Sequence, residues 1–273
     1  MKRSMVFILF FVSAPLLLAA RVVQQLYMLD STTGFYADGF SGIGTAVTVL
    51  CFALTAVTFV MVWLSHPKKP NIPSHSKPLA AAAFFAALCL IISATASALS
   101  SDKGTNLAVS VLGFAAAVAI AWYGVSLMLE ISYPPLATTI PVLYATLRLV
   151  LSFIKYTGEI TVTDTVFDIA TMCFILLFFY SSGKLIAGVG GTRTHVFLYA
   201  FGLGAAFFCA DSALARLVIM LTHSSVTLHG GGSFDISYIG IAVYAVVMIW
   251  VFTDKTERDS VPAASEAAEG MPE

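Results

Sequence analysis

Charged residues are scarce in this sequence of 273 residues. Only 11% are Asp, Glu, Lys or Arg and 59% are hydrophobic, whereas a soluble domain carries about 25% charged and about 45–50% apolar residues. Because so little charge cannot cover a surface that faces water, a soluble globular domain is excluded. The apolar residues form runs long enough to cross a bilayer, so the sequence predicts an integral membrane protein with several spans.

Several arrangements that mark known chemistries are also missing. No lysine lies in the middle of an apolar run, which argues against a retinal Schiff base, and the five histidines show no metal-ligand spacing. Gly183-Lys184 lacks the preceding glycine and strand of a phosphate-binding loop. We therefore expect no catalytic residue, cofactor, metal or nucleic-acid partner, and an enzyme is the least favoured class of function.

Two short patterns suggest intramembrane proteolysis, but each lacks its partner. Gly39-Phe40-Ser41-Gly42 resembles the serine motif of rhomboid proteases, which need a histidine on a neighbouring span, and no histidine is central to a span here. Asp168 and Asp211 lie on consecutive spans, but neither has the sequence context of an aspartyl protease. The glycine-rich motif is better explained as a tight entry into a helix.

The cysteines lie within apolar runs and not in the loops where disulfides would form. They are expected to act as small apolar packing residues. The four residues are Cys51, Cys89, Cys173 and Cys209.

Eight apolar runs reach the about 20 residues that a helix needs to cross the hydrocarbon core. The sequence therefore predicts an all-α bundle of about eight transmembrane helices over residues 1–253, followed by a disordered cytoplasmic tail over residues 254–273. No segment is long enough to form a separate soluble domain. The predicted spans are Met5–Met28, Ile43–Leu64, Leu79–Leu99, Leu107–Leu129, Leu136–Ile154, Val166–Leu185, Val196–Leu221 and Ile236–Phe252.

Basic residues gather on alternate connections, and short cytoplasmic loops retain positive charge. If the N-terminus is cytoplasmic, the outer loops carry only Lys103 and Lys155. We therefore predict that both termini are cytoplasmic. The inner segments then carry Lys2, Arg3, Lys68, Lys69, Lys77, Lys184, Arg193, Lys255 and Arg258.

The first span follows Lys2-Arg3 as a secretory signal peptide would. A cleavage after Ala20 would place Leu18 where a small residue is needed, and the apolar character continues past Arg21. We expect this segment to be retained as a helix, and cleavage would leave seven spans in the same orientation.

Three arginines lie inside predicted spans, each near the outer end of an odd-numbered span. They occur in similar tetrapeptides, which suggests a helical hairpin repeated four times, although the third span has no arginine and a chance likeness explains the pattern equally well. The tetrapeptides are Ala20-Arg21-Val22-Val23, Leu147-Arg148-Leu149-Val150 and Ala215-Arg216-Leu217-Val218.

Charges at these depths are costly, at about 2.5–3.5 kcal/mol for a central position. Arg21, Gln24 and Gln25 share one helix face by their spacing. Asp211 and Arg216 are five residues apart, a poor pair within one helix, so Asp211 is expected to meet an arginine of another helix. Further polar stripes are Tyr144, Arg148 and Ser152, then Asp164, Asp168 and Thr171, then Ser212, Arg216 and His223.

Three functional interpretations remain open, and the last of them is proton coupling through Asp211. In the first, the arginines pair with Asp168 and Asp211 and only join helices, as in a membrane scaffold or a non-catalytic subunit with a partner chain. In the second, three arginines against two membrane aspartates leave surplus positive charge, and a wet outer vestibule binds a small anionic or polar ligand, as in a transporter-like protein. Its candidate ligand-binding residues are Arg21, Gln24, Gln25, Arg148, Asp211 and Arg216.

One short stretch of the sequence resembles part of a known group of proteins. Arg21-Val22-Val23-Gln24-Gln25-Leu26, running into Asp30-Ser31-Thr32-Thr33-Gly34-Phe35-Tyr36, resembles the opening of uncharacterised multispanning membrane proteins of Gram-positive bacteria. The resemblance covers about sixteen residues and carries no known activity. It implies a bacterial plasma membrane as the location and implies no function.

Overall fold

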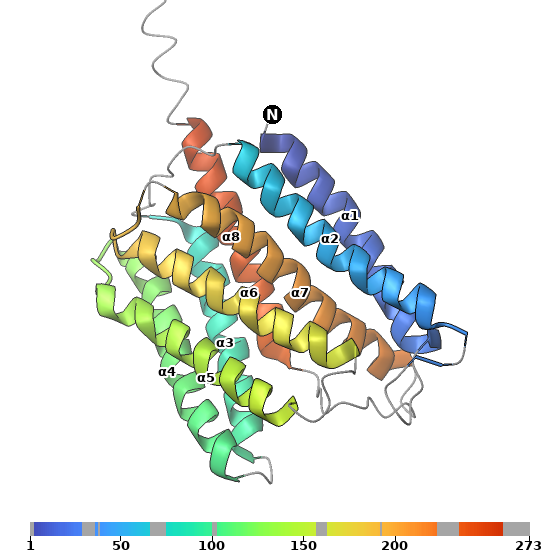
Figure 1. The fold of residues 1–273 in the computed structure, drawn as a ribbon. Coiled ribbons are helices and arrows are strands. Elements are labelled where there is room, and N and C mark those ends of the chain that lie inside the picture. The colour runs from blue at the N-terminus through green and yellow to red at the C-terminus, as the bar shows by residue number, and fades with distance from the viewer. Residues whose placement is uncertain are drawn as a thin grey trace, which may run out of the picture.

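The computed structural model describes residues 3–28, 36–37, 39–65, 75–99, 103–156, 163–191, 193–222 and 235–258. In these residues the chain is all-α, with eight helices that are each long and apolar enough to cross a membrane (Figure 1). The helices are α1 (Arg3–Val23) with a π-helical turn η1 (Gln24–Met28), α2 (Ser41–Ser65), α3 (Lys77–Leu99), α4 (Lys103–Leu129), a 3-10 turn η2 (Pro135–Thr138) with α5 (Thr139–Tyr156), α6 (Thr163–Ile186), α7 (Thr194–Thr222) and α8 (Ile236–Arg258).

Each of the eight predicted spans coincides with one of these helices, so the prediction of eight helices long and apolar enough to cross a membrane is confirmed. The last helix differs at its end, because α8 continues to Arg258. The first residues of the segment 254–273, predicted as a disordered tail, are therefore helical. The rest of that segment lies outside the described residues.

The first and last helices indicate which ends of the chain lie together. Figure 1 shows the start of α1 and the end of α8 at the same end of the molecule, as an even number of crossings requires. This agrees with the prediction that both termini share one side of the membrane. That this side is the cytoplasm remains a prediction from the distribution of basic residues.

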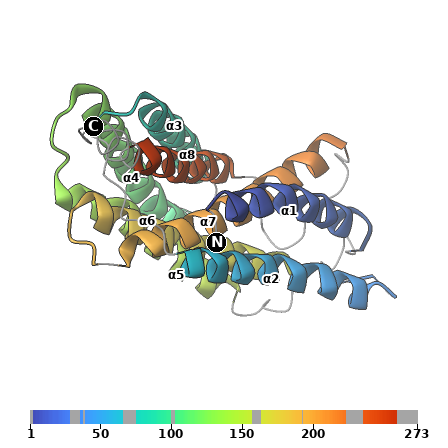
Figure 2. The ribbon, with the colours of Figure 1, turned by 90° about the horizontal axis from the view of Figure 1, so that it is seen from above.

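The centre of the bundle is α7, which packs against α1, α2, α6 and α8. Most of its membrane-spanning length is buried inside the protein. On one side α8 also packs on α3, which in turn packs on α4, and α5 lies between α4 and α6. Figure 2 shows α1 and α2 at one end of the molecule and α3 and α4 at the other. Charges on α7 are therefore surrounded by protein.

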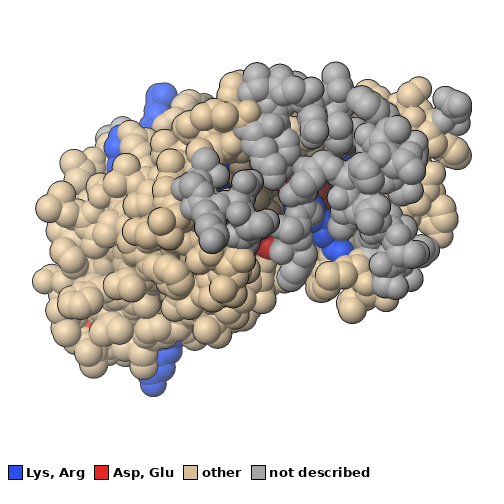
Figure 3. Space-filling model, turned by 90° about the horizontal axis from the view of Figure 1, so that it is seen from below, with Lys and Arg blue, Asp and Glu red and all other residues tan. Residues whose placement is uncertain are grey.

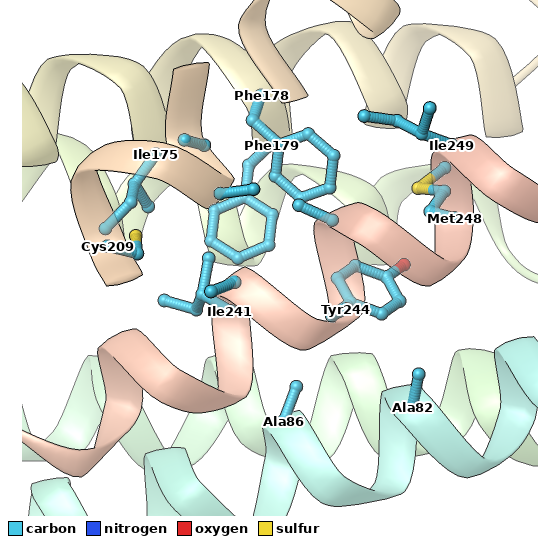
Figure 4. Close-up of a cluster of buried hydrophobic side chains, with 14 of the residues drawn as sticks. Ala82, Ala86, Ile175, Phe178, Phe179, Cys209, Ile241, Tyr244, Met248 and Ile249 are labelled. Carbon is cyan, nitrogen blue, oxygen red and sulfur yellow. The ribbon is translucent and has the colours of Figure 1, made fainter. Parts of the chain in front are cut away.

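Small residues allow α3 and α8 to approach closely. A side chain at Gly240 would place its Cβ 2.7 Å from the Cys89 Cβ and 3.0 Å from the Ala86 Cα. Figure 4 shows Ala82 and Ala86 of α3 facing α8, whose other side meets α6 and α7. Lipid tails give helices no hydrophobic reason to associate, so close van der Waals contact of this kind supplies much of the stability.

The α1–α2 hairpin packs on α7 largely through aromatic rings. Phe52 on α2 lies 5.2 Å from Phe208 and 5.7 Å from Phe167, measured between ring centroids. The opposite face of α1 is open to the surroundings, with Val12 and Leu16 69% and 72% exposed. Exposure of such large apolar side chains is expected where a helix faces lipid.

Candidate functional site

The end of α1 is irregular where its polar residues lie. Gln24 begins a π-helical turn, and both Gln24 and Gln25 are buried, although neighbouring residues of a regular α-helix point about 100° apart. The wider π turn brings the two amides to the protein-facing side together, as single π turns at functional sites often do. Arg21, Gln24 and Gln25 are all buried, in agreement with the prediction that they share one helix face.

Arg21 joins α1 to α6 and α7 and is only 1% exposed. Its Nη1 donates a hydrogen bond to Gln24 Oε1 at 2.7 Å, and its Nε lies 3.6 Å from Asp211 Oδ2. The guanidinium also lies over the Phe167 ring, 4.0 Å from the ring centroid. The prediction that Asp211 meets an arginine of another helix is therefore confirmed.

Gln24 connects Arg21 to α2 through hydrogen bonds. Its Nε2 donates to Gly44 O at 2.7 Å, Tyr36 Oη at 2.9 Å and Thr48 Oγ1 at 3.2 Å. Gly44 has no side chain because a Cβ there would lie 2.1 Å from the Tyr36 ring. One glutamine amide thus links Arg21 to α2 and closes the hairpin at the end of α1.

A second ion pair joins α6 and α7. Arg216 Nη2 donates to both carboxylate oxygens of Asp168, at 2.8 Å each. Further into the bundle the Thr171 and Ser212 hydroxyls are 2.9 Å apart across the same interface. The pairing of Asp168 with an arginine agrees with the interpretation in which the charges join helices, and the stripe of Asp168 and Thr171 faces α7.

A third ion pair joins α5 to the start of α8. Arg148 Nη2 contacts the carboxylate of Asp235, while Nη1 donates to Tyr144 Oη at 2.9 Å and Ser237 Oγ at 3.2 Å. The guanidinium lies 5.2 Å from the centroid of the Tyr238 ring. With 19% of the Arg148 side chain and 11% of the Asp235 side chain exposed, this pair is the most accessible of the three.

Asp235 also caps α8. Its Oδ1 accepts a hydrogen bond from the backbone N–H of Ser237 at 2.9 Å, which places a negative charge at the positive end of the helix dipole. Burial alone would raise the pKa of the Asp235 carboxyl, but Arg148 and hydrogen bonds from Ser237 and Ser93 lower it below its ordinary value. The carboxylate therefore stays ionised at neutral pH.

We predict that Asp235 makes the fold sensitive to acid. Since its pKa is lower in the folded protein than the value of 3.8 of a free carboxyl, the unfolded chain takes up the proton first as the pH falls. The stabilisation is complete above pH 3.8 and is lost as the pH drops through the lower pKa of the folded state. Thermal unfolding of the detergent-solubilised protein between pH 2 and pH 5 should reveal this slope below pH 3.8, and Asp235→Asn should flatten it. An unchanged slope in the variant would assign the acid sensitivity to other groups.

The structure changes the charge count on which the vestibule hypothesis rested. The sequence indicated three arginines against two membrane aspartates, but Asp235, counted as a loop residue, supplies a third carboxylate. In the described part of the chain Arg21, Arg148 and Arg216 each contact a carboxylate from another element. The premise of surplus positive charge was therefore wrong.

The six candidate residues fall into separate groups. Arg21 contacts both Gln24 and Asp211, Arg216 binds Asp168, and Arg148 contacts Asp235. Tyr238 lies within electrostatic reach of the last two groups. Figure 3 shows basic and acidic atoms close to one another at the end of the bundle opposite the start of α1 and the end of α8. The chain is thus a multi-pass membrane protein with buried intramembrane ion pairs that lie toward one end.

Two cavities in the described structure lie away from these charges. One is an apolar groove of about 460 Å³ between α1, α7 and α8, and the other is a small cavity of about 20 Å³ between α4, α5, α6 and α8. Neither lining includes an arginine or an aspartate. The charged residues therefore do not surround a ligand-sized space in these two places.

No protein-family model matches the sequence, and no curated protein or solved structure is significantly similar to it. The function is therefore argued from the geometry of the ion pairs.

Proposed function

We propose that the protein is a non-catalytic membrane subunit or scaffold, whose intramembrane charges serve to join its helices. The observation that carries the proposal is that Arg21, Arg148 and Arg216 each contact a carboxylate from another element. A charge that is already compensated in a medium of low dielectric attracts a second anion only weakly. The orientation with cytoplasmic termini and a bacterial plasma membrane as the location belong to the same proposal.

The pairs account for the cost of the charges without a ligand. An isolated guanidinium or carboxylate in hydrocarbon is strongly penalised, whereas a paired one with further hydrogen bonds is tolerated. Arg216 contacts both oxygens of Asp168, and Arg21 has Gln24 and the Phe167 ring in addition to Asp211. An anion entering here would have to displace a bound carboxylate and bury it elsewhere.

The contacts around Arg148 favour a second candidate function. Arg148 and Asp235 remain partly exposed, and Tyr144 and Ser237 lie beside them as hydrogen-bonding groups. A small polar ligand approaching from the outer side would meet this group first. A transporter-like or ligand-binding protein that uses Arg148, and not all six residues predicted from the sequence, is the form of the vestibule hypothesis that fits this geometry.

A thermal-shift screen of anionic metabolites separates the two candidates. For a scaffold we expect no compound to raise the unfolding temperature of the wild-type protein in a way that depends on Arg148 or Arg21. The variants Arg148→Gln and Arg21→Gln would then respond to each compound as the wild type does. A stabilisation that is present in the wild type and lost in Arg148→Gln alone would contradict the scaffold and establish the ligand-binding function.

A further inference from the structure

An apolar groove of about 460 Å³ lies between α1, α7 and α8. Stretches of equal length from the three helices line it, over residues 10–18, 206–214 and 239–247. Each stretch rises about 12 Å at 1.5 Å per residue. All three lie within the candidate membrane spans, so the groove runs through the hydrocarbon layer.

The walls of the groove are apolar throughout. Alanines at positions 14, 206, 210 and 242 leave the space, and phenylalanine, leucine, isoleucine and valine side chains with Pro15 complete the lining. A proline inside a helix removes a backbone hydrogen bond and bends the helix, and Pro15 lies on the α1 wall of the groove. No lining side chain carries a charge or a hydrogen-bonding group.

The mouth of the groove opens on the surface that faces lipid. Phe11 on α1, Leu214 on α7 and Val243 on α8 all line it and are 51%, 37% and 38% exposed. Protein interiors rarely keep an apolar space of this size, because the lining atoms lose their van der Waals contacts. In a membrane, hydrocarbon chains can reach this mouth directly.

The volume of the groove can be compared with the volumes of a helix and of a hydrocarbon chain. A helix with its side chains is about 10–12 Å across, so about four residues of helix would fill a volume of this size. A membrane-spanning helix of a partner or of a second copy needs about 20 residues, several times what this volume holds. A flexible, unbranched hydrocarbon chain fits a groove about 12 Å long without burying any polar group.

We propose that the groove between α1, α7 and α8 binds an acyl chain of a membrane phospholipid as a defined site, distinct from the lipids that contact the rest of the surface. The bound chain fills the space between α1 and α8 and supplies packing contacts that the two helices do not supply themselves. The proposal is independent of the function proposed above, since no ion-pair residue lines the groove.

Photo-crosslinking in lipid nanodiscs tests this site. The protein is reconstituted with phosphatidylcholine that carries a diazirine in the middle of one acyl chain, and adducts are mapped by mass spectrometry. In the wild type we expect adducts on residues 10–18, 206–214 and 239–247 to exceed those around Val57 several-fold at every fraction of photoactive lipid. Val57 is 48% exposed on α2 and reports ordinary contact with lipid.

Two variants fill the groove from opposite walls. Ala210→Trp on α7 and Ala14→Trp on α1 should each lower the groove adducts at least fivefold and leave the α2 adducts unchanged. The matched control Val57→Trp adds the same side chain on α2, outside the groove, and should leave the groove adducts at the wild-type level.

Two results would overturn the proposal. One is a wild-type groove that gives no more adducts than the α2 surface at the same fraction of photoactive lipid, which would make it ordinary lipid-facing surface. The other is a groove shielded from the photolipid and crosslinked instead to a second protein chain, which would assign the space to a protein partner. Because the comparison of the groove with the α2 surface uses the wild type, it decides even if a tryptophan variant fails to fold.

Discussion

Replacing Arg216 with methionine is expected to lower the free energy of unfolding by about 3–5 kcal/mol, the usual loss when one partner of a buried ion pair is removed. The substitution leaves the buried Asp168 carboxylate without the nitrogen that contacts both of its oxygens at 2.8 Å. Hydrogen bonds between membrane helices average only about 0.6 kcal/mol, so a loss of the larger size would come from the uncompensated charge. Unfolding in a titration with denaturing detergent measures it.

The control for this variant is Arg193→Met, at an exposed arginine of the connection before α7. Arg193 contacts only an aromatic ring in the described contacts, with its guanidinium 5.0 Å from the Trp63 centroid. An exposed cation–π contact is worth about 0.5–1 kcal/mol, so this loss should be several-fold smaller. Equal losses in the two variants would show that the pairing with Asp168 has no special weight.

The second large effect is expected for Gly240→Val at the contact of α3 with α8. Even the first carbon of the new side chain would lie 2.7 Å from the Cys89 Cβ and 3.0 Å from the backbone at Ala86. Neither atom belongs to a flexible side-chain end, so the two helices must separate. We expect a loss of about 3 kcal/mol, at the upper end for overpacking of a core, together with a lower unfolding temperature.

A matched glycine on α2 provides the control. Gly42 lies in a helix, and a Cβ there would meet nothing within 4 Å. Gly42→Val should therefore change the free energy of unfolding by no more than about 0.5 kcal/mol, as surface substitutions usually do. A comparable loss at both glycines would indicate that valine acts through the helix backbone and not through the α3–α8 contact.

The membrane-spanning helices could be predicted from the sequence because their signal is one-dimensional. A run of about 20 apolar residues matches the thickness of the hydrocarbon core, and each such run forms one helix here. The pairing of Asp211 was also predictable in part. A deep charge needs a partner, and its spacing from Arg216 excluded that residue, which left an arginine of another helix; the structure identifies it as Arg21.

The role of Asp235 was missed for a physical reason. It directly precedes the last predicted span, Ile236–Phe252, and so lies outside the apolar runs in which the membrane charges were counted. In the structure it is held by Arg148 and caps α8 through the backbone N–H of Ser237. An acidic residue directly before an apolar helix is a capping signal, and that signal could have identified Asp235.

The π turn after Arg21 could not be predicted from residue spacing. Regular spacing alone placed Gln24 and Gln25 near one face, whereas in the structure the wider turn η1 starts at Gln24 and carries both. That turn goes with contacts to Gly44 and Thr48 on another helix, which are tertiary and leave no local pattern. The repeat of four hairpins remains a prediction. The arginines of the three tetrapeptides contact carboxylates of different elements, since Arg21 contacts α7, Arg148 contacts the residue before α8 and Arg216 contacts α6.

The central claim is that the intramembrane charges serve to join helices, and a double-mutant cycle on Arg216 and Asp168 tests it most directly. The double variant Arg216→Met with Asp168→Leu removes both charges and keeps the site apolar, which is often neutral or stabilising for buried pairs. We predict that it unfolds within about 1 kcal/mol of the wild type, while each single variant loses about 3–5 kcal/mol. Losses that simply add in the double variant would contradict the claim and show that the two charges act separately.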